Sequence, residues 1–147
     1  MENIIITNSE KETEQAGAKI AASLHKNSFL ALFGDLGAGK TALTRGLVSH
    51  LIPKATRLVH SPTFALVNEY IGDDLTIYHF DMYRISGADE LYAIGFDDYL
   101  DNGIIVTEWS ENIVDALPAD AIKVVIERLS DNERRITISN LRNFKGE

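Results

Sequence analysis

The sequence contains no cysteine and has much less positive than negative charge. The absence of cysteine excludes disulfides, thiolate catalysis, zinc ribbons and iron–sulfur clusters. The 14 Lys and Arg residues against 22 Asp and Glu residues give a formal net charge of −8. Because such a surface on average repels phosphate backbones, we do not expect strong nucleic-acid binding by this chain alone.

Long apolar runs and targeting features are also lacking. Uncharged apolar stretches such as SFLALFG are far too short to span a bilayer. The amino-terminal sequence MENIIITNSEKE has no basic region ahead of an apolar one, as a secretory signal would have. At 147 residues, without repeats or low-complexity tracts, the sequence predicts a single cytoplasmic domain over residues 1–147 with no membrane contact.

The first half of the chain alternates between predicted strands and helices. Residues 3–7 are a short β-branched strand, and Ser9 with Glu12 forms a capping-box pattern at the start of a helix. Residues 28–33 form a continuous apolar run, typical of a strand covered on both faces of a parallel sheet. Residues 40–51 then carry their apolar side chains at helical spacing.

The second half predicts two hairpins and one more buried strand. The sequences ALVNEY and LTIYHF flank IGDD, and AIKVVIER and RRITIS flank SDNE, which is typical of antiparallel pairs. IIVTEW reads as a buried strand, and two short helices over residues 88–94 and 97–100 are joined at Gly95. The order of elements predicts an α/β fold with a mostly parallel central sheet and added antiparallel hairpins.

The segment FGDLGAGKTAL contains the pattern G-x-x-x-x-G-K-[ST] between a buried strand and a helix. Glycines permit the close approach of backbone N–H groups to a polyphosphate, and the start of the helix adds its positive dipole end. The lysine supplies a cation for the β- and γ-phosphates, and the threonine supplies a hydroxyl for Mg²⁺. We therefore predict a three-layer P-loop NTPase-like fold that binds ATP and Mg²⁺ through Gly34, Asp35, Leu36, Gly37, Ala38, Gly39, Lys40 and Thr41.

Hydrolysis also requires carboxylates at the ends of neighbouring strands. Glu108 follows IIVT and Asp81 follows TIYHF, so both are placed at the edge where open α/β sheets carry their sites. We expect Glu108 to hold Mg²⁺ directly or through water, and Lys40, Asp81 and Glu108 to be the catalytic residues. Each acid has the alternative role of capping a turn.

Other polar and aromatic residues allow both structural and functional interpretations. The loop SPTF contains Thr63, which is either a sensor of the nucleotide state or part of a simple turn. Trp109, the only tryptophan, is either core packing or an aromatic ring at the site. The four histidines have no metal-ligand spacing and read as solvated or core residues, and the tyrosines at 70, 78 and 83 read as hairpin packing.

Four motifs, GDLGAGKT, SPTF, YHFDMYRI and TEW, occur in this order between Ser9 and about Trp109. Together they closely resemble the bacterial TsaE family (older name YjeE), the small ATPase of tRNA threonylcarbamoyladenosine synthesis. The remaining carboxyl-terminal part is similar only in pattern. The resemblance implies an ATPase that joins TsaB and TsaD and supports threonylcarbamoylation of adenosine 37 in tRNAs reading codons that begin with A. Its partners would hold the tRNA.

The resemblance also implies roles for individual residues. The family's phosphate loop falls on residues 37–41, with Thr41 and Glu108 as the magnesium residues. The positions of Asp81, Thr63 and Trp109 match motif positions implied in hydrolysis and nucleotide sensing. Glu10 matches the amino-terminal segment that the family brings near the adenosine.

Two other functions share the phosphate loop. A small-molecule kinase would need an acceptor pocket and an arginine-bearing lid, for which little chain is left, although Arg84 could serve as a charge stabiliser for phosphate transfer to a small acceptor. A nucleotide-gated docking module would bind ATP mainly to set a conformation. A guanine-reading N-K-x-D does not occur, which argues against a GTPase switch. Because no arginine finger is evident, we predict slow hydrolysis by the isolated chain.

Overall fold

The computed structural model describes residues 2–35, 37–62, 66–142 and 144. The strands are β1 (Glu2–Thr7), β2 (Phe29–Phe33), β3 (Val67–Ile71), β4 (Thr76–Asp81), β5 (Ile104–Glu108), β6 (Ile122–Arg128) and β7 (Arg134–Ser139). The α-helices are α1 (Glu10–Ala21), α2 (Lys40–Leu51) and α3 (Ala88–Ala93), and the 3₁₀ helices are η1 (Pro53–Leu58), η2 (Phe96–Asp98) and η3 (Ser110–Ala116).

All seven strands form one sheet in the order β1-β7-β6-β2-β5-β4-β3. The four central strands β6, β2, β5 and β4 are parallel, whereas β7 and β3 run antiparallel to their neighbours. This arrangement confirms the predicted α/β fold, with a parallel centre and an antiparallel hairpin on each side. Strands β2 and β5 are buried almost throughout because both of their faces are covered.

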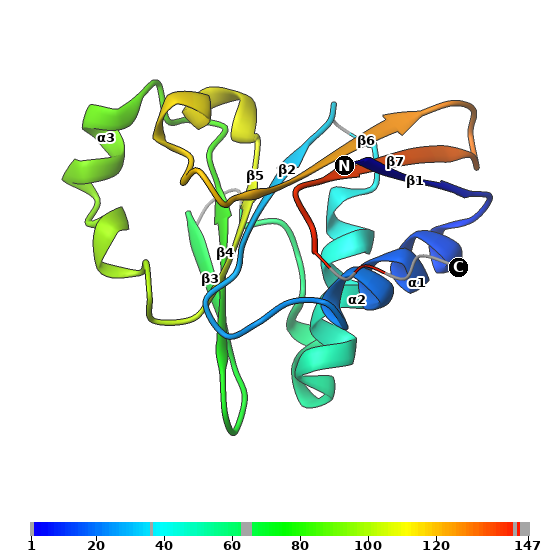
Figure 1. The fold of residues 1–147 in the computed structure, drawn as a ribbon, viewed down its shortest axis with the longest axis horizontal. Helices are drawn as coiled ribbons and strands as arrows, with labels where there is room; N and C mark the ends of the chain where they lie inside the picture. The colour runs from blue at the N-terminus through cyan, green and yellow to red at the C-terminus, as the bar shows by residue number, and fades with distance from the viewer. Residues whose placement is uncertain (1, 36, 63–65, 143, 145–147) are drawn as a thin grey trace.

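Helices cover the two faces of the sheet differently (Figure 1). On one face, α1 and α2 pack against the sheet through side chains such as Ile20 and Leu47. On the other face, α3, η2 and η3 cover β2, β5 and β4, with Phe96 and Ile113 in that core. The core is therefore split by the sheet into two clusters. In the described residues no helix is long and apolar enough to cross a membrane.

Sequence patterns predicted the bounds of most helices and strands to within one or two residues of the bounds in the structure. Helix α2 spans the predicted residues 40–51, and both predicted hairpins form. Ser9 caps α1 by accepting a hydrogen bond from Glu12 N at 3.1 Å, as predicted. The Glu12 carboxylate, however, accepts from Asn8 N at 2.8 Å, one residue earlier than in a capping box. The 3₁₀ helices η1 and η3 were not predicted.

The two long helices cross at very close range, which brings their amino-terminal ends to one side of the sheet. A Cβ on Gly46 of α2 would lie 1.7 Å from Glu14 O, and one on Gly17 of α1 would lie 2.0 Å from Leu43 O. Both contacts are with backbone atoms, so a side chain at either position would push the helices apart. Two glycines thus set the distance between α1 and the phosphate loop that precedes α2.

We expect the substitution Gly46→Ala to lower the free energy of unfolding by about 3 kcal/mol, because the added methyl group overlaps the α1 backbone. Urea unfolding followed by circular dichroism would measure this loss. Gly87→Ala is the matched control, since nothing lies within 4 Å of a Cβ at that position. A loss for Gly46→Ala no larger than that of the control would contradict the close helix crossing.

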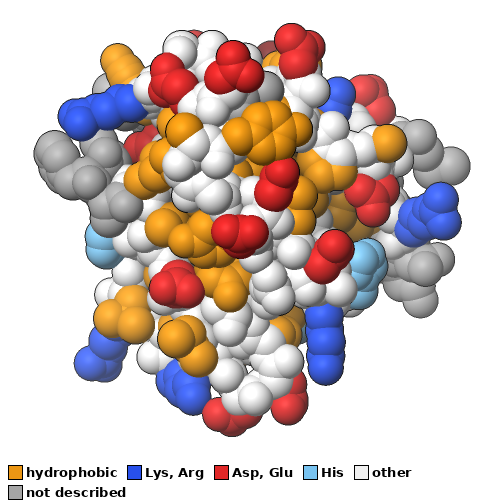
Figure 2. All heavy atoms as spheres, turned by 90° about the vertical axis from the view of Figure 1, so that its left-hand side faces the viewer, with side chains coloured by type: hydrophobic (Ala, Val, Ile, Leu, Met, Phe, Trp, Pro, Cys, Tyr) orange, Lys and Arg blue, Asp and Glu red, His pale blue; other side chains and the backbone are white. Residues whose placement is uncertain are grey.

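Charge is distributed unevenly along the chain. Residues 85–122, which form α3, η2, β5 and η3, contain nine Asp and Glu residues and no Lys, Arg or His. The rest of the chain has 13 acidic and 14 basic residues. Figure 2 shows the corresponding face, where acidic and hydrophobic side chains are interspersed and basic ones lie at the margins. This face repels phosphate backbones.

Candidate functional site

The glycine-rich loop between β2 and α2 adopts backbone conformations that favour glycine. Gly37 has φ of +81° and Gly39 has φ of +112°. These values lie in a region that residues with a Cβ rarely adopt. Gly39 is also the N-cap residue of α2, so the unpaired N–H groups of the first helical turn begin directly after the loop. Leu36, which was predicted to belong to the loop, lies outside the described residues.

The ammonium group of Lys40 lies inside its own loop. Nζ donates a hydrogen bond to Gly34 O and sits over the Trp109 ring, 3.9 Å from the ring centroid. Burial lowers the pKa of Lys40, while nearby carboxylates, Glu108 first, act in the opposite direction. A polyphosphate would replace the carbonyl of Gly34 with far stronger acceptors for this cation.

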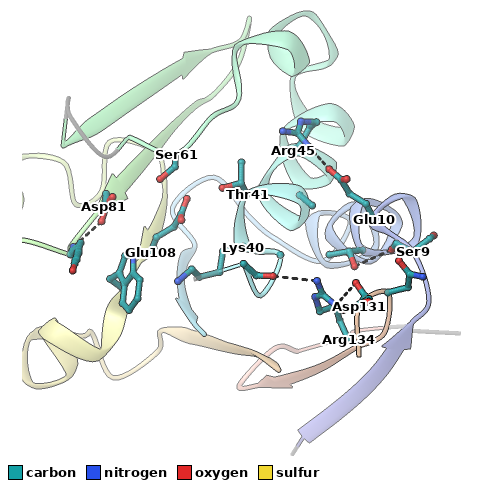
Figure 3. Close-up of a pocket in the computed structure, with 17 residues that line it drawn as sticks. Ser9, Glu10, Lys40, Thr41, Arg45, Ser61, Asp81, Glu108, Asp131 and Arg134 are labelled. Atoms are coloured by element: carbon teal, nitrogen blue, oxygen red, sulfur yellow. Dashed lines mark hydrogen bonds and ion pairs between the residues drawn. The ribbon is translucent and has the colours of Figure 1, made fainter. Parts of the chain in front are cut away.

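The two predicted carboxylates are brought side by side by the sheet. Asp81 ends β4 and Glu108 ends β5, and the two residues are partners in the parallel register. Both are buried. Asp81 Oδ1 accepts a hydrogen bond from Tyr83 N at 2.8 Å. Figure 3 shows Glu108 and Asp81 on one side of a pocket, facing Thr41 at the start of α2.

Glu108 is held from behind by a chain of buried side chains. His79 is fully buried; its Nε2 bonds Glu108 Oε2, and its Nδ1 lies 2.9 Å from the Tyr70 hydroxyl. With Glu108 ionised, Nε2–H donates to the carboxylate and Nδ1 accepts from the phenol. Burial raises the pKa of Tyr70, which keeps the phenol protonated for this role. The hydrogen bonds from Tyr70 to His79 and from His79 to Glu108 fix the orientation of the Glu108 carboxylate.

His79 was interpreted from the sequence as a solvated or core residue, and the structure places it in the core. Its contact with Glu108 was not predicted. One signal was available: His79 and Asp81 are two residues apart on β4, so their side chains point to the same face of the sheet. The strand order that puts Glu108 beside them was not visible in the sequence.

Trp109 connects the phosphate loop to η3. Its backbone is left-handed, with φ of +57°, an unusual conformation for a bulky residue. Its ring packs against Tyr83 with centroids 5.1 Å apart, as well as against Lys40. Glu111 in η3 accepts a hydrogen bond from Gly34 N at 3.1 Å. Two contacts therefore join the loop to this helix.

Most of the predicted site residues line one pocket of about 700 Å³. Among the sequence-predicted site residues, the lining includes Glu10, Gly37, Gly39, Lys40, Thr41, Asp81, Glu108 and Trp109. Gly34, Asp35 and Ala38 shape the loop without lining the pocket. Thr63 lies outside the described residues, although Ser61 from the same motif lines the pocket.

The far end of the pocket contains residues that sequence reasoning missed. Figure 3 shows Ser9 at the start of α1, Arg45 from α2, and Asp131 and Arg134 from the β6–β7 hairpin. Thr13 of α1 also lines the pocket. Asn132 lies at the same end. Glu10, the one predicted residue here, accepts from Arg45 Nη1 at 3.4 Å and is largely exposed.

The residues around Thr41 and Glu108 can hold a metal only together with a ligand. Within the described ranges, no three His, Asp or Glu side chains are grouped to bind a metal ion by themselves. A hydroxyl and one carboxylate are hard oxygen donors, and a Mg²⁺ ion bound there would complete its shell with water and phosphate oxygens. This incomplete set fits a metal that arrives with a nucleotide.

A buried central strand that is followed by a glycine-rich loop and a helix defines the P-loop NTPase-like class of α/β folds. A family model described as threonylcarbamoyl adenosine biosynthesis protein TsaE matches residues 7–136. The chain belongs to the TsaE family. The resemblance expected from four motifs up to Trp109 is thus confirmed, and it extends into β7.

Relatives and a solved structure agree with this assignment. The tRNA threonylcarbamoyladenosine biosynthesis protein TsaE of Rickettsia felis is 39% identical over 135 residues, covering 92% of this chain and 78% of the relative. The protein of that name from Bacillus subtilis is 40% identical over 134 residues, covering 90% and 82%. The crystal structure of Bacillus subtilis YdiB has a TM-score of 0.73 at 34% identity and covers 94% of this chain and 84% of that one.

Proposed function

We propose that this chain binds and hydrolyses ATP with Mg²⁺ and, together with TsaB and TsaD, supports threonylcarbamoylation of adenosine 37 in tRNAs reading codons that begin with A. The names of its relatives support the pathway. The observation that carries the ATPase proposal is a single pocket that combines a phosphate-binding loop with Lys40, Thr41 and two buried carboxylates.

The pocket suits a nucleotide in size and in charge. Its volume of about 700 Å³ falls within the range of about 300–1,000 Å³ for small-molecule sites. The loop amides and the amino-terminal end of α2 would face the phosphates, and Lys40 would exchange the carbonyl of Gly34 for phosphate oxygens. Thr41 and Glu108 would hold Mg²⁺, which when bound neutralises charge on the phosphate oxygens.

The two carboxylates would have different roles because their hydrogen bonds differ. Glu108 Oε2 is committed to His79, which leaves Oε1 for the metal or its water. Asp81 Oδ1 is committed to Tyr83 N, which leaves Oδ2 to orient a water molecule and accept its proton. The Trp109 ring packs on the Lys40 ammonium group, so its surroundings would change when Lys40 turns toward a bound phosphate.

The acidic face is consistent with an indirect role toward tRNA. Residues 85–122 contain no basic side chain, so the tRNA would be held by the partner proteins rather than by this face.

Slow hydrolysis of ATP by the isolated chain is also expected. Arg84, the candidate charge stabiliser, is exposed and is not among the described residues that line the pocket.

A reconstituted modification reaction would test the proposal. We expect tRNA threonylcarbamoylation by TsaB and TsaD to require this protein over multiple turnovers and to fail with a Lys40→Ala variant. Phosphate release should be slow for the isolated chain and rise at least about tenfold when TsaB and TsaD are added, because a partner completes the site.

Other outcomes of the same experiment would favour the alternatives. Modification that proceeds equally well without this protein would contradict the proposed function. If a non-hydrolysable ATP analogue sustains full tRNA modification over many turnovers, the nucleotide-gated docking module is favoured. The contacts between the phosphate loop and η3 would then transmit nucleotide binding to the docking surface. Transfer of phosphate to a small acceptor would favour a kinase.

A further inference from the structure

Arg134 is the first residue of β7. Within the part of the chain that the structure describes, its guanidinium donates hydrogen bonds to main-chain oxygens. Nε donates to Ala38 O at 2.8 Å, and Nη2 donates to Gly37 O at 3.2 Å. Nη1 lies within hydrogen-bond distance of three carbonyls of the β6–β7 turn. These are Ser130 O at 2.8 Å, Glu133 O at 3.0 Å and Asp131 O at 3.3 Å.

The two carbonyls on the loop side belong to the phosphate loop itself. No peptide bond in the described residues is cis, so the C=O and N–H of each peptide point in opposite directions. Holding Ala38 O on the Arg134 side therefore turns the N–H of Gly39 to the opposite side. In the same way, holding Gly37 O fixes the peptide that carries Ala38 N, which donates to Asp35 O at 3.0 Å.

The loop needs such an external restraint at Gly37, because packing buries Ala38 and Lys40 but leaves Gly37 open. A Cβ on Gly37 would have no heavy atom within 4 Å, so this part of the loop projects into open space. Glycine also loses more conformational freedom on ordering than any other residue. A loop that must be ordered by its ligand would bind that ligand more weakly than a loop that is already fixed.

Arg134 also connects the loop to the opposite wall of the pocket. The turn that it holds with Nη1 contains Asp131 and Asn132, both of which line the far end of the pocket. The planar guanidinium presents donors in two directions, whereas a lysine ammonium offers a single point of attachment. One side chain thus fixes two segments that are almost 100 residues apart in sequence.

We propose that Arg134 is a positioning residue that ties the phosphate loop to the β6–β7 turn and so presets both walls of the pocket before a nucleotide binds. The inference deepens the proposed ATP-binding function and rests on it for its functional consequence. Arg134 acts through the main chain of Gly37 and Ala38 and not on the reacting atoms.

The test compares Arg134→Lys and Arg134→Ala with Arg135→Ala in the full chain. Arg135 is the matched control because it is the neighbouring residue on β7 and pairs with Glu127 instead. Hydrogen exchange of the Ala38 amide, which donates to Asp35 O within the loop, should be at least about tenfold faster in both nucleotide-free Arg134 variants and unchanged in the control. Mg–ATP affinity should fall about tenfold to a hundredfold in both Arg134 variants only.

Failure to restore binding with lysine separates positioning from charge. Exchange and affinity at the wild-type level in Arg134→Lys would overturn the proposal, as would unchanged loop exchange in Arg134→Ala. If Arg134→Ala is too unstable to measure, Arg134→Lys and Arg134→Gln give the same comparison. If the wild-type protein does not bind ATP, the proposed function fails, while the exchange rates still decide whether Arg134 fixes the loop.

Discussion

Replacing Lys40 with alanine is expected to weaken Mg–ATP binding at least about 100-fold, since the substitution removes charge-assisted hydrogen bonds to two phosphate groups. The fold should tolerate the change. In the absence of ligand, burial of the ammonium group outweighs the attraction of the nearby carboxylates, as its lowered pKa indicates, so its contacts with the Gly34 carbonyl and the Trp109 ring add little net stability. We expect the free energy of unfolding to change by less than about 1 kcal/mol.

Titration calorimetry with Mg–ATP would measure the affinity, and the fluorescence of Trp109 would report the movement of Lys40. Trp109 is the only tryptophan in the chain, and its ring lies under the ammonium group. Nucleotide should change its emission in the wild type at concentrations that leave Lys40→Ala unaffected. Lys11→Ala, on the exposed side of α1, is the control. Retention of ATP affinity in Lys40→Ala would falsify the phosphate-loop assignment.

Replacing Glu108 with glutamine is expected to separate binding from hydrolysis. The amide is close to the carboxylate in shape and can still accept from His79, but it is a poor ligand for Mg²⁺. Single-turnover hydrolysis should fall about 100-fold or more, a typical loss when one stabilising group in the transition state is removed. Binding of ATP measured without Mg²⁺ should change by no more than about threefold, because the phosphate loop is intact.

Magnesium titrations would identify the cause of the loss. Half-maximal hydrolysis by Glu108→Gln should require a higher Mg²⁺ concentration than the wild type. Asp115→Asn, an exposed carboxylate in η3, should behave as the wild type and controls for the change in net charge. Normal hydrolysis at the wild-type Mg²⁺ requirement would show that Glu108 has no metal role.

Several parts of the fold followed from local sequence. Helix α2 and both hairpins formed where apolar spacing and turn residues predicted them. These elements depend on contacts between residues close in the chain, and those contacts leave a periodic pattern. The helix η3 left no such pattern. Its N-cap residue, Trp109, has a left-handed conformation, and a hydrogen bond joins Glu111 of the helix to Gly34 across 77 positions in the sequence.

The site was predictable to the extent that its residues follow strands directly. Asp81 and Glu108 stand at strand ends, and parallel strands bring their carboxyl ends to the same edge. His79 and Arg134 were missed because their partners, Glu108 and the loop carbonyls, lie 29 and about 96 positions away. Only the pairing of β4 with β5 and the position of the β6–β7 turn create those contacts.

The sequence by itself determined the phosphate loop, because the conformation that grips a phosphate needs glycines at fixed spacing between a strand and a helix. Family membership could also be inferred from short motifs in order. The tertiary structure alone decided how the carboxylate of Glu108 is oriented and what restrains the loop from outside. The physical reason is that both depend on hydrogen bonds between distant segments, whose geometry is set by strand order and packing rather than by neighbouring residues.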